Sequence, residues 1–393
     1  MNPEINVSVD EFTLLLLPTQ EVTAKDWSLC SQSIINRFLC LSQFEIILGE
    51  LETTTNKLQA GYTCGLTVID KPYYCGIFWN EDIPSMAVCV KMSATALRYY
   101  EAETKSNYGQ SIFLYRFLQI IQAPDIYKTR FSRIDLVVDY YNYPSLINSG
   151  NGYLLPSEIY NNLKQSKYRV EDYKGVSKIR TFKGIESKGV CETFYVGSQR
   201  SGSNGFLRCY DKQIEQIKKR GNFYNKAIKV DSWLRCEAVF RNKPAHDLTE
   251  QLLKIDSLSD YQAWVATHIS NKYRFLDVTT DEYIKITSDL LDVASGIIVP
   301  ALSSDKPKDN SLEQSIANLY VGSGLMSILH KIEYLYGADG IRAFLDNIVS
   351  YFDFEYAKDK SKKRAILKWL SIHSSEYKNK TIQEVLCEYN SNE

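Results

Sequence analysis

The alternation of apolar and polar positions predicts a protein built mainly from strands through about residue 241. Short apolar runs bounded by turn residues, which are typical of buried strands, occur at residues 9–17, 61–69, 73–79, 86–92, 131–140, 178–183, 190–196 and 233–241. A further strand and a helix follow the Gly/Ser-rich turn after Val196. Helical spacing occurs at 23–51 with a break near Ser42, and at 93–103, 110–121 and 156–165. The order β-α-β-β-β-α-α-β-α-β-β-β-α-β predicts an α+β fold with a mainly antiparallel central sheet and flanking helices.

The pattern changes after Asn242, where apolar residues recur at helical spacing. We predict helices at 252–276, 281–293, 312–349 and 363–372, with a polar, Pro-containing linker at 303–310. The chain therefore divides into an α+β core at 1–247 and a helical C-terminal region at 248–393. The second region is predicted to serve DNA recognition or dimerisation.

Composition excludes several classes of protein. The net charge of −1 over 393 residues means that nucleic acid must be bound by local basic stripes rather than by bulk charge. The nine cysteines are odd in number and form no Cys-x-x-Cys pair, which argues against a disulfide framework and a structural zinc site. The sequence shows neither a signal peptide nor an apolar run long enough for a membrane span, so we expect a cytoplasmic protein.

Three predicted strands carry polar side chains on one face. Alternate residues of a strand share a face, so each strand contributes a one-sided polar row. The first row belongs to 131–140, the second to the strand that ends at Tyr210, and the third to 233–241. The rows are Arg133, Asp135 and Asp139; Arg208 and Tyr210; and Arg235 and Glu237.

If the three faces coincide, the rows form a site for phosphate chemistry. Carboxylate oxygens suit Mg²⁺ or Mn²⁺, which polarises a phosphate, and arginines stabilise charge on its oxygens. Tyr210 is a candidate nucleophile, and the flanking cations of Arg208 and Lys212 are expected to favour its phenolate. Each row alone has an ordinary structural explanation: a solvated ion-pair ladder, a structural Arg–Glu pair, or a packed tyrosine. The weight of the prediction lies in their occurring together.

Three motifs carry a resemblance to a known family. They are Phe-Ser-Arg-Ile-Asp-Leu-Val-Val-Asp-Tyr at 131–140, the stretch 194–216 with Phe-Leu-Arg-Cys-Tyr-Asp-Lys, and Trp-Leu-Arg-Cys-Glu-Ala-Val-Phe-Arg-Asn at 233–242. In order and spacing they resemble the rolling-circle replication initiators of the staphylococcal plasmid type (the replication initiation factor, or Rep_trans, family) and the conjugative relaxases that share their core. The resemblance covers about residues 9–247. One departure is the segment from Gly197 to Arg200, which is one residue longer than the family pattern.

The resemblance implies an origin-specific DNA nickase. Its tyrosine, here Tyr210, attacks one strand, keeps the 5′-phosphate covalently and frees a 3′-OH for polymerase. The resemblance also implies metal ligation by Asp135 and Glu237, with Asp139 as a third candidate. A homodimer that works with a host helicase and polymerase is implied as well.

The histidines distinguish this family from the other large class of rolling-circle enzymes, which uses a His-hydrophobe-His metal motif. The four histidines, at 246, 268, 330 and 373, are isolated and lie outside the predicted core strands. They cannot build that metal site, so we interpret them as surface or packing residues.

Basic residues near the motifs are candidate DNA contacts, because phosphates dominate the affinity for nucleic acid. A cluster that begins near Lys358 in the C-terminal region is a candidate contact for duplex origin DNA. A solvated loop or a basic helix terminus is the ordinary explanation for any single cluster. The predicted contacts are Arg133, Arg200, Arg235, Lys218, Lys219 and Arg220 in the core, and Lys362, Lys363 and Arg364 in the C-terminal region.

Two alternatives to a rolling-circle initiator stay open. A conjugative relaxase would use the same chemistry, but relaxases of this kind often carry a helix-turn-helix module before the core, whereas this core begins almost at Met1. A non-catalytic DNA-binding protein would keep the core without the reaction. The presence of Tyr210, Asp135 and Glu237 argues against that alternative.

Overall fold

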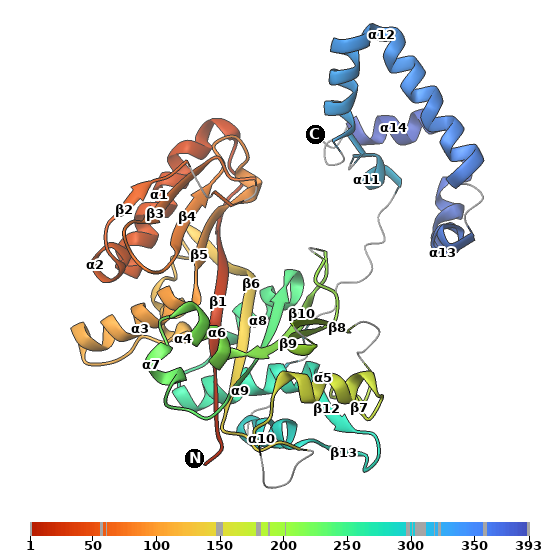
Figure 1. Ribbon diagram of the computed structural model, residues 1–393. Coiled ribbons are helices and arrows are strands. Elements are labelled where there is room, and N and C mark those ends of the chain that lie inside the picture. Colours follow the sequence, from red (N-terminus) through yellow and green to blue (C-terminus); the bar gives the residue numbers. More distant parts are fainter. Residues whose placement is uncertain are drawn as a thin grey trace. The chain divides into compact units, whose positions relative to one another are not determined.

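The computed structural model describes residues 2–390, apart from 56–57, 60, 147–151, 178–181, 188, 201, 296–298, 301, 303–311, 318, 321–323 and 357–359. It consists of two compact units, Met1–Ser304 and Asp305–Glu393 (Figure 1). The predicted linker at 303–310 and part of the predicted strand at 178–183 lie outside the described residues.

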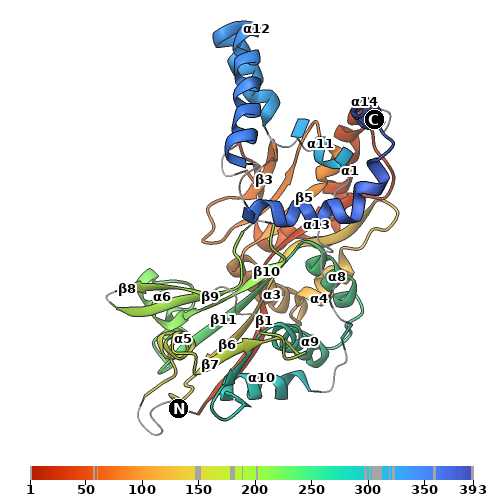
Figure 2. The same cartoon turned by 90° about the vertical axis from the view of Figure 1, so that its right-hand side faces the viewer.

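The first unit is organised around a ten-stranded sheet in which every neighbouring pair is antiparallel (Figure 2). The order is β2-β3-β4-β5-β1-β6-β11-β10-β9-β8. This confirms the predicted α+β class with a mainly antiparallel sheet. The strands are β1 (Glu4–Pro18), β2 (Leu51–Thr53), β3 (Cys64–Val68), β4 (Cys75–Trp79), β5 (Val88–Met92), β6 (Tyr127–Tyr141), β8 (Phe182–Ser187), β9 (Val190–Val196), β10 (Gly205–Asp211) and β11 (Trp233–Arg241).

The helices of this unit mostly begin and end where the sequence predicts. Ser93 caps α3, because its hydroxyl accepts a hydrogen bond from the backbone N–H of Ala96. The predicted break near Ser42 is the boundary between α1 and α2, where Gln43 adopts a left-handed conformation. These helices are α1 (Ala24–Ser42), α2 (Phe44–Leu48), α3 (Ala94–Tyr108), α4 (Leu114–Ile120), α5 (Pro156–Lys164), α6 (Lys212–Lys219) and α7 (Tyr224–Ala227), with a 3-10 turn η1 (Pro84–Met86).

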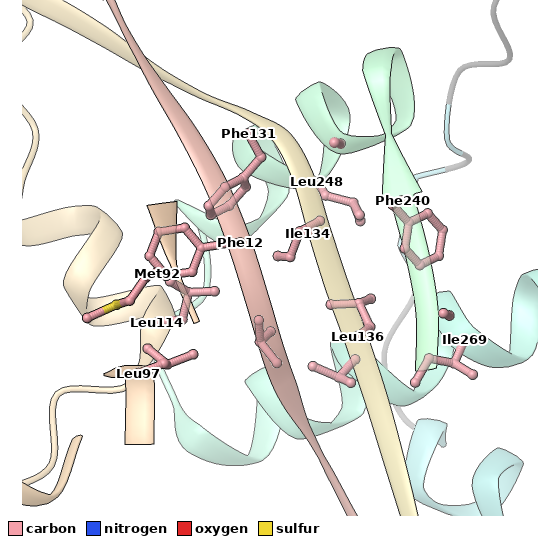
Figure 3. Close-up of a cluster of buried hydrophobic side chains, with 14 of the residues drawn as sticks. Phe12, Met92, Leu97, Leu114, Phe131, Ile134, Leu136, Phe240, Leu248 and Ile269 are labelled. Carbon is pink, nitrogen blue, oxygen red and sulfur yellow. The ribbon is translucent and has the colours of Figure 1, made fainter. Parts of the chain in front are cut away.

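One face of the sheet is apolar and forms the core. Ile134, Leu136 and Phe240 lie on this face beside Leu248 of helix α8 (Asn242–Leu252) and Ile269 of helix α9 (Leu258–Lys272), as Figure 3 shows. Fully burying such a side chain contributes about 1.5–3 kcal/mol. This apolar packing fixes which way each strand faces, because a shift of one residue would turn its apolar side chains to the other face.

Residues 248–304 pack with the first unit, although we predicted them as part of a separate helical region that begins at 248. The hydroxyl of Tyr140 on β6 donates a hydrogen bond to the carbonyl of Ile286 on α10 (Lys285–Ala294). The apolar faces of α8, α9 and α10 contribute to the main core. The structure therefore places the division of the chain after Ser304 rather than after 247.

The predicted helix at 252–276 is wrong in its extent, because two helices and a strand occupy this segment. The hydroxyl of Ser257 caps α9, which ends at Lys272. The strand β12 (Arg274–Asp277) then joins a small sheet, of order β13-β12-β7, with β7 (Tyr168–Glu171) and β13 (Glu282–Tyr283). The pairing of Phe275 with Val170 is long-range, so local periodicity did not reveal it.

The C-terminal unit is helical, as predicted. It contains α11 (Leu312–Ala317), α12 (Leu325–Tyr351), a π-helical turn η3 (Phe352–Tyr356), α13 (Lys360–Tyr377) and α14 (Ile382–Asn390). The backbone of α12 departs from helical geometry at Gly337, where φ is 69°. Among the residues that the structure describes, no helix combines the length and the apolar character that crossing a membrane requires.

Candidate active site on the polar face of the sheet

The three predicted polar rows lie on the same face of the sheet. Strands β6, β11 and β10 are neighbours, and their register pairs Tyr210 with Arg235 and Arg235 with Asp139. The next row pairs Arg208 with Glu237. Directly paired residues of antiparallel strands project to one side, so the proposed nucleophile and the acidic residues share a surface opposite the apolar core.

Tyr210 is held by Glu237 at the end of β10. Its hydroxyl donates a 2.6 Å hydrogen bond to Glu237 Oε1, and the residue is only 3% exposed. The Arg208 guanidinium lies 4.2 Å from the centre of the tyrosine ring, and Lys212 Nζ lies 5.4 Å from it. Both predicted cations therefore contact the ring rather than the hydroxyl.

The pKa of Tyr210 contradicts the prediction that flanking cations favour its phenolate. Burial raises the pKa well above the ordinary value, and the negative charge of Glu237 raises it further. Arg235 opposes these effects without overcoming them. Tyr210 is therefore a neutral phenol in this structure, and a group that removes its proton is needed before it can act as a nucleophile.

Local sequence explains why the tyrosine stands where a strand becomes a helix. Asp211 follows it and caps α6, because its carboxylate accepts a hydrogen bond from the backbone N–H of Ile214 at 2.8 Å. At the other end of β10, Gly205 approaches β11 so closely that a Cβ would lie 1.8 Å from the carbonyl oxygen of Val239, and its φ is +131°. Only glycine fits there.

Glu237 connects the tyrosine with an arginine. Its Oε1 accepts the hydrogen bond from Tyr210, and its Oε2 lies 3.3 Å from Arg208 Nη1. Burial raises the pKa of Glu237, the carboxylate of Asp10 raises it further, and Arg208 opposes both. A buried carboxylate with a raised pKa that already contacts the phenol is suited to accept its proton.

Asp135 forms a two-pronged ion pair with Arg133 on the same strand. Arg133 Nε donates to Oδ1 at 2.9 Å and Nη2 donates to Oδ2 at 2.6 Å. Burial raises the pKa of Asp135 to about 7, although Arg133 acts to lower it. The carboxyl group can therefore exchange a proton near neutral pH.

Asp139, which we predicted as a third metal ligand, has a different environment. Its Oδ1 accepts hydrogen bonds from Arg235 Nε at 2.7 Å and from Trp233 Nε1 at 2.6 Å, and its Oδ2 accepts one from Arg235 Nη2 at 2.8 Å. Both oxygens are thus occupied by buried donors. The structure makes Asp139 one half of a buried ion pair that joins β6 to β11.

Arg235, which we predicted as a DNA contact, is the other half of this pair. It is 5% exposed, and its Nη1 donates to Asp10 Oδ1 at 2.7 Å. Three of its five N–H groups donate to the two carboxylates, and the side chain is almost wholly buried, so it is poorly placed to meet a phosphate from solvent. It stands directly opposite Tyr210 in the sheet, where its charge acts to lower the pKa of the phenol.

Two acidic residues of the polar face escaped the sequence prediction. Asp10 and Glu11 lie where the pairing of β1 with β6 shifts register, between Val9 and Phe12. Glu11 Oε1 is buried without a hydrogen bond, although Lys91 Nζ and Arg133 Nη1 each lie 3.4 Å away. The feature of the sequence that could have revealed them is a pair of acidic residues inside an apolar strand.

The donor set suits a hard divalent cation. Glu237 is close enough to Asp135 for its charge to raise the pKa of Asp135, and Glu11 contributes an oxygen without a hydrogen bond. Carboxylate oxygens are the ligands that Mg²⁺ and Mn²⁺ prefer. Among the described residues no three acidic, cysteine or histidine side chains converge on one point as a formed metal site, because arginines lie between the carboxylates.

The remaining predicted DNA contacts do not belong to the polar rows. Arg200 is exposed in the loop between β9 and β10, and Arg220 is exposed at the left-handed end of α6. Lys218 contacts Glu192 at 2.8 Å, and Lys219 contacts Glu215 at 3.0 Å. The backbone of α13 carries Lys362, Lys363 and Arg364, whose side chains lie outside the described part of the structure.

Histidine makes no contribution to the polar rows. His268 is buried in α9, where its ring packs against Trp264 at 5.0 Å, and burial lowers its pKa to about 3. This matches the prediction that it is a packing residue.

The comparisons with known proteins agree with the motifs. The family model described as replication initiation factor matches residues 129–292. Residues 129–292 are therefore similar to the replication initiation factor family. This region contains β6, β10 and β11 with all three polar rows, and it extends through most of α10, beyond the predicted limit of 247. The resemblance inferred from the three motifs is confirmed.

The curated proteins and the solved structures add less to this similarity. No curated protein matches the chain. Among solved structures, a rolling circle replication initiator protein from Geobacillus stearothermophilus is similar at 17% sequence identity, with a TM-score of 0.48. That match covers 74% of this chain and 97% of the other.

Proposed function

We propose that this protein initiates rolling-circle DNA replication by nicking one strand at an origin through Tyr210. The observation that carries the proposal is the hydrogen bond from the Tyr210 hydroxyl to Glu237, formed on a polar sheet face within the region similar to the replication initiation factor family. A tyrosine poised to lose a proton beside arginines matches what attack on a phosphodiester needs.

In the proposed step, Tyr210 Oη attacks phosphorus while its proton passes to Glu237. The bond between phosphorus and the 3′ oxygen breaks, and that oxygen leaves with the electron pair and takes a proton from solvent. The products are a tyrosine ester of the 5′-phosphate and a free 3′-OH. No oxidant or reductant is consumed, and joining is the reverse of the same step.

Proton transfer also changes the charges around the phosphate. Glu237 is the ionic partner of Arg208, at 3.3 Å. When Glu237 takes the proton it becomes neutral, and the charge of Arg208 is then available to the phosphoryl oxygens. Lys212, which contacts Glu215 at 2.6 Å, adds a second cation beside the tyrosine ring. Cations placed where negative charge develops stabilise the transition state.

A divalent cation would add to this charge stabilisation. Asp135, with Glu11 beside it, would hold Mg²⁺ or Mn²⁺, and Glu237 would contribute an oxygen only while it is unprotonated. Such an ion, when bound, polarises the phosphoryl oxygens. To bind the ion, the carboxylates must lose their protons and break their ion pairs with the arginines. Metal binding is therefore expected to strengthen as pH rises through the raised pKa of Asp135.

The freed 3′-OH would prime a host polymerase, with a host helicase opening the duplex and a homodimer acting at the origin. These partners follow from the kind of initiator proposed. The DNA beside the gene separates this role from that of a conjugative relaxase: an inverted repeat with a nick site supports the initiator, and an adjacent transfer operon supports the relaxase.

The proposal is tested with labelled single-stranded oligonucleotides tiled across the DNA that flanks the gene, incubated with protein and Mn²⁺. Wild type should form a denaturant-resistant protein–DNA adduct on one oligonucleotide. Tyr210→Phe should form none, whereas Tyr173→Phe, which alters an exposed tyrosine outside the polar rows, should form it normally. An adduct that persists in Tyr210→Phe would remove this residue as the nucleophile.

A further inference from the structure

A second group of residues lies further along the polar face and takes no part in the proposed step. Tyr195 of β9 stands opposite Arg208, and Phe206 of β10 stands opposite Val239. Arg241 of β11 stands opposite Arg133. All of them therefore project to the same side of the sheet as Tyr210.

Two of these residues form an aromatic surface. The ring centres of Tyr195 and Phe206 are 6.0 Å apart, and the rings are inclined by 57°. Phe206 is largely covered, whereas Tyr195 is partly exposed and can offer its ring to a ligand. Exposed Lys183 of β8 stands directly opposite Tyr195 and adds a cation at the edge of this surface.

Arg241 gives the surface an uncompensated charge. Its guanidinium lies 5.2 Å from the centre of the Phe206 ring, and its Nη1 donates to the carbonyl of Gln199 at 3.4 Å. No carboxylate among the described residues lies within ion-pair distance of it. Arg133, the residue opposite Arg241, already forms ion pairs with Asp135 and Glu11.

Two arginines directly opposite each other on one sheet face repel. Burial and Arg133 lower the pKa of Arg241, in accord with that repulsion. An anion placed between or beside them would relieve it. The same arginine lies over an aromatic ring, so the surface offers a charge for a phosphate and a π-face for a base within one cluster.

We propose that Tyr195, Phe206 and Arg241 form a binding site for a nucleotide of single-stranded DNA, with the base on Tyr195 and a phosphate at Arg241. The identity of the ligand rests on the proposed nicking function. Phe206 lies four residues from Tyr210 along β10, roughly 13 Å at the rise of a strand. The site would therefore hold a nucleotide that flanks the one attacked by Tyr210.

The proposed ligand is a single strand because bases in a duplex are stacked on each other and present no free face. The partly exposed ring of Tyr195 can therefore stack only with an unpaired base. The loop that carries Arg200 is tied to the site through the hydrogen bond from Arg241 to Gln199. This places an additional exposed cation beside the path of the strand.

The test measures binding of the full chain to a fluorescein-labelled 20-nucleotide oligothymidine and to a labelled duplex of equal length, by fluorescence anisotropy without divalent metal. We expect Tyr195→Leu and Arg241→Gln each to weaken single-strand binding about tenfold, with duplex binding changed less than twofold. Tyr195→Phe keeps the ring and should bind as wild type. Arg116→Gln is the matched control, because Arg116, an exposed residue of α4, also lies over an aromatic ring, that of Tyr115.

Each outcome decides the proposal. Equal affinities for Tyr195→Leu, Arg241→Gln and Arg116→Gln would overturn it, and so would an equal loss for single strand and duplex. Thermal unfolding checks that the variants fold, which is expected because the side chains of Tyr195 and Arg241 are partly exposed. Tyr210→Phe should bind the oligonucleotide normally, so a failure of the nicking proposal is distinguished from a failure of this one.

Discussion

The hydroxyl of Tyr210 donates a 2.6 Å hydrogen bond to Oε1 of Glu237, which stands two residues along the neighbouring strand from Arg235. Tyr210 is paired with Arg235 and Glu237 with Arg208, so the contact runs diagonally across two cross-strand pairs. This geometry makes a buried carboxylate, rather than a flanking cation, the group that controls the proton of the tyrosine.

Glu237→Gln should therefore slow adduct formation by about 10²- to 10⁴-fold, the usual contribution of a general base. The amide keeps the shape of the side chain but does not accept the phenolic proton. Single-turnover formation of the protein–DNA adduct measures the effect. Glu192→Gln, which removes only the partner of Lys218, should react at the wild-type rate. Equal rates for the two variants would contradict the role of Glu237.

The pH dependence of stability should report Asp135. Burial raises its pKa from 3.8 to about 7, so between these pH values the folded protein holds a proton that the unfolded chain has released. The contribution of Asp135 to the free energy of unfolding is then greatest at low pH and is lost as pH rises through about 7. Urea unfolding of wild type and Asp135→Asn, in chelator from pH 4.5 to 8, should show wild type losing stability relative to the variant as pH rises. A constant difference would contradict the prediction.

Asp139 and Asp135 should respond differently to substitution. Asp139→Ala leaves Arg235 buried with one carboxylate fewer and should cost about 3–5 kcal/mol in the free energy of unfolding. Asp135→Asn should instead weaken Mn²⁺ binding, measured by calorimetry, because it removes a predicted ligand. If Asp139→Asn, which retains a hydrogen-bond acceptor, lowers Mn²⁺ affinity as much as Asp135→Asn does, Asp139 is a ligand after all.

Gly205→Ala should destabilise the protein by at least about 1–3 kcal/mol, because an alanine there is strained at φ +131° and its Cβ would meet the carbonyl oxygen of Val239. Gly202 lies in the same loop with open space around it, so Gly202→Ala is the matched control and should be nearly neutral. Thermal unfolding measures both. Equal melting temperatures would show that β10 can shift away from β11 at this point.

Local sequence determined most of the elements and the direction of the functional side chains. Period-2 alternation in 131–140 and 233–241 was enough to place Asp135 and Glu237 on one face of their strands. Ser93 marked the start of its helix correctly, because the backbone N–H that its hydroxyl satisfies lies three residues away. The motif spacing around Tyr210 was also enough to indicate the family.

Long-range pairing decided the rest. The bulge of β1 brings Asp10 and Glu11 to strands more than 120 residues away in the sequence, as the register of β1 with β6 requires. Only that proximity shows that Asp139 is hydrogen-bonded to Arg235, and that the effect of burial on the pKa of Tyr210 outweighs the effect of the cations around it. It also shows that no carboxylate among the described residues lies within ion-pair distance of Arg241. Ion pairing and desolvation depend on which groups are neighbours in space, and in a sheet the neighbours are set by strands distant in the chain.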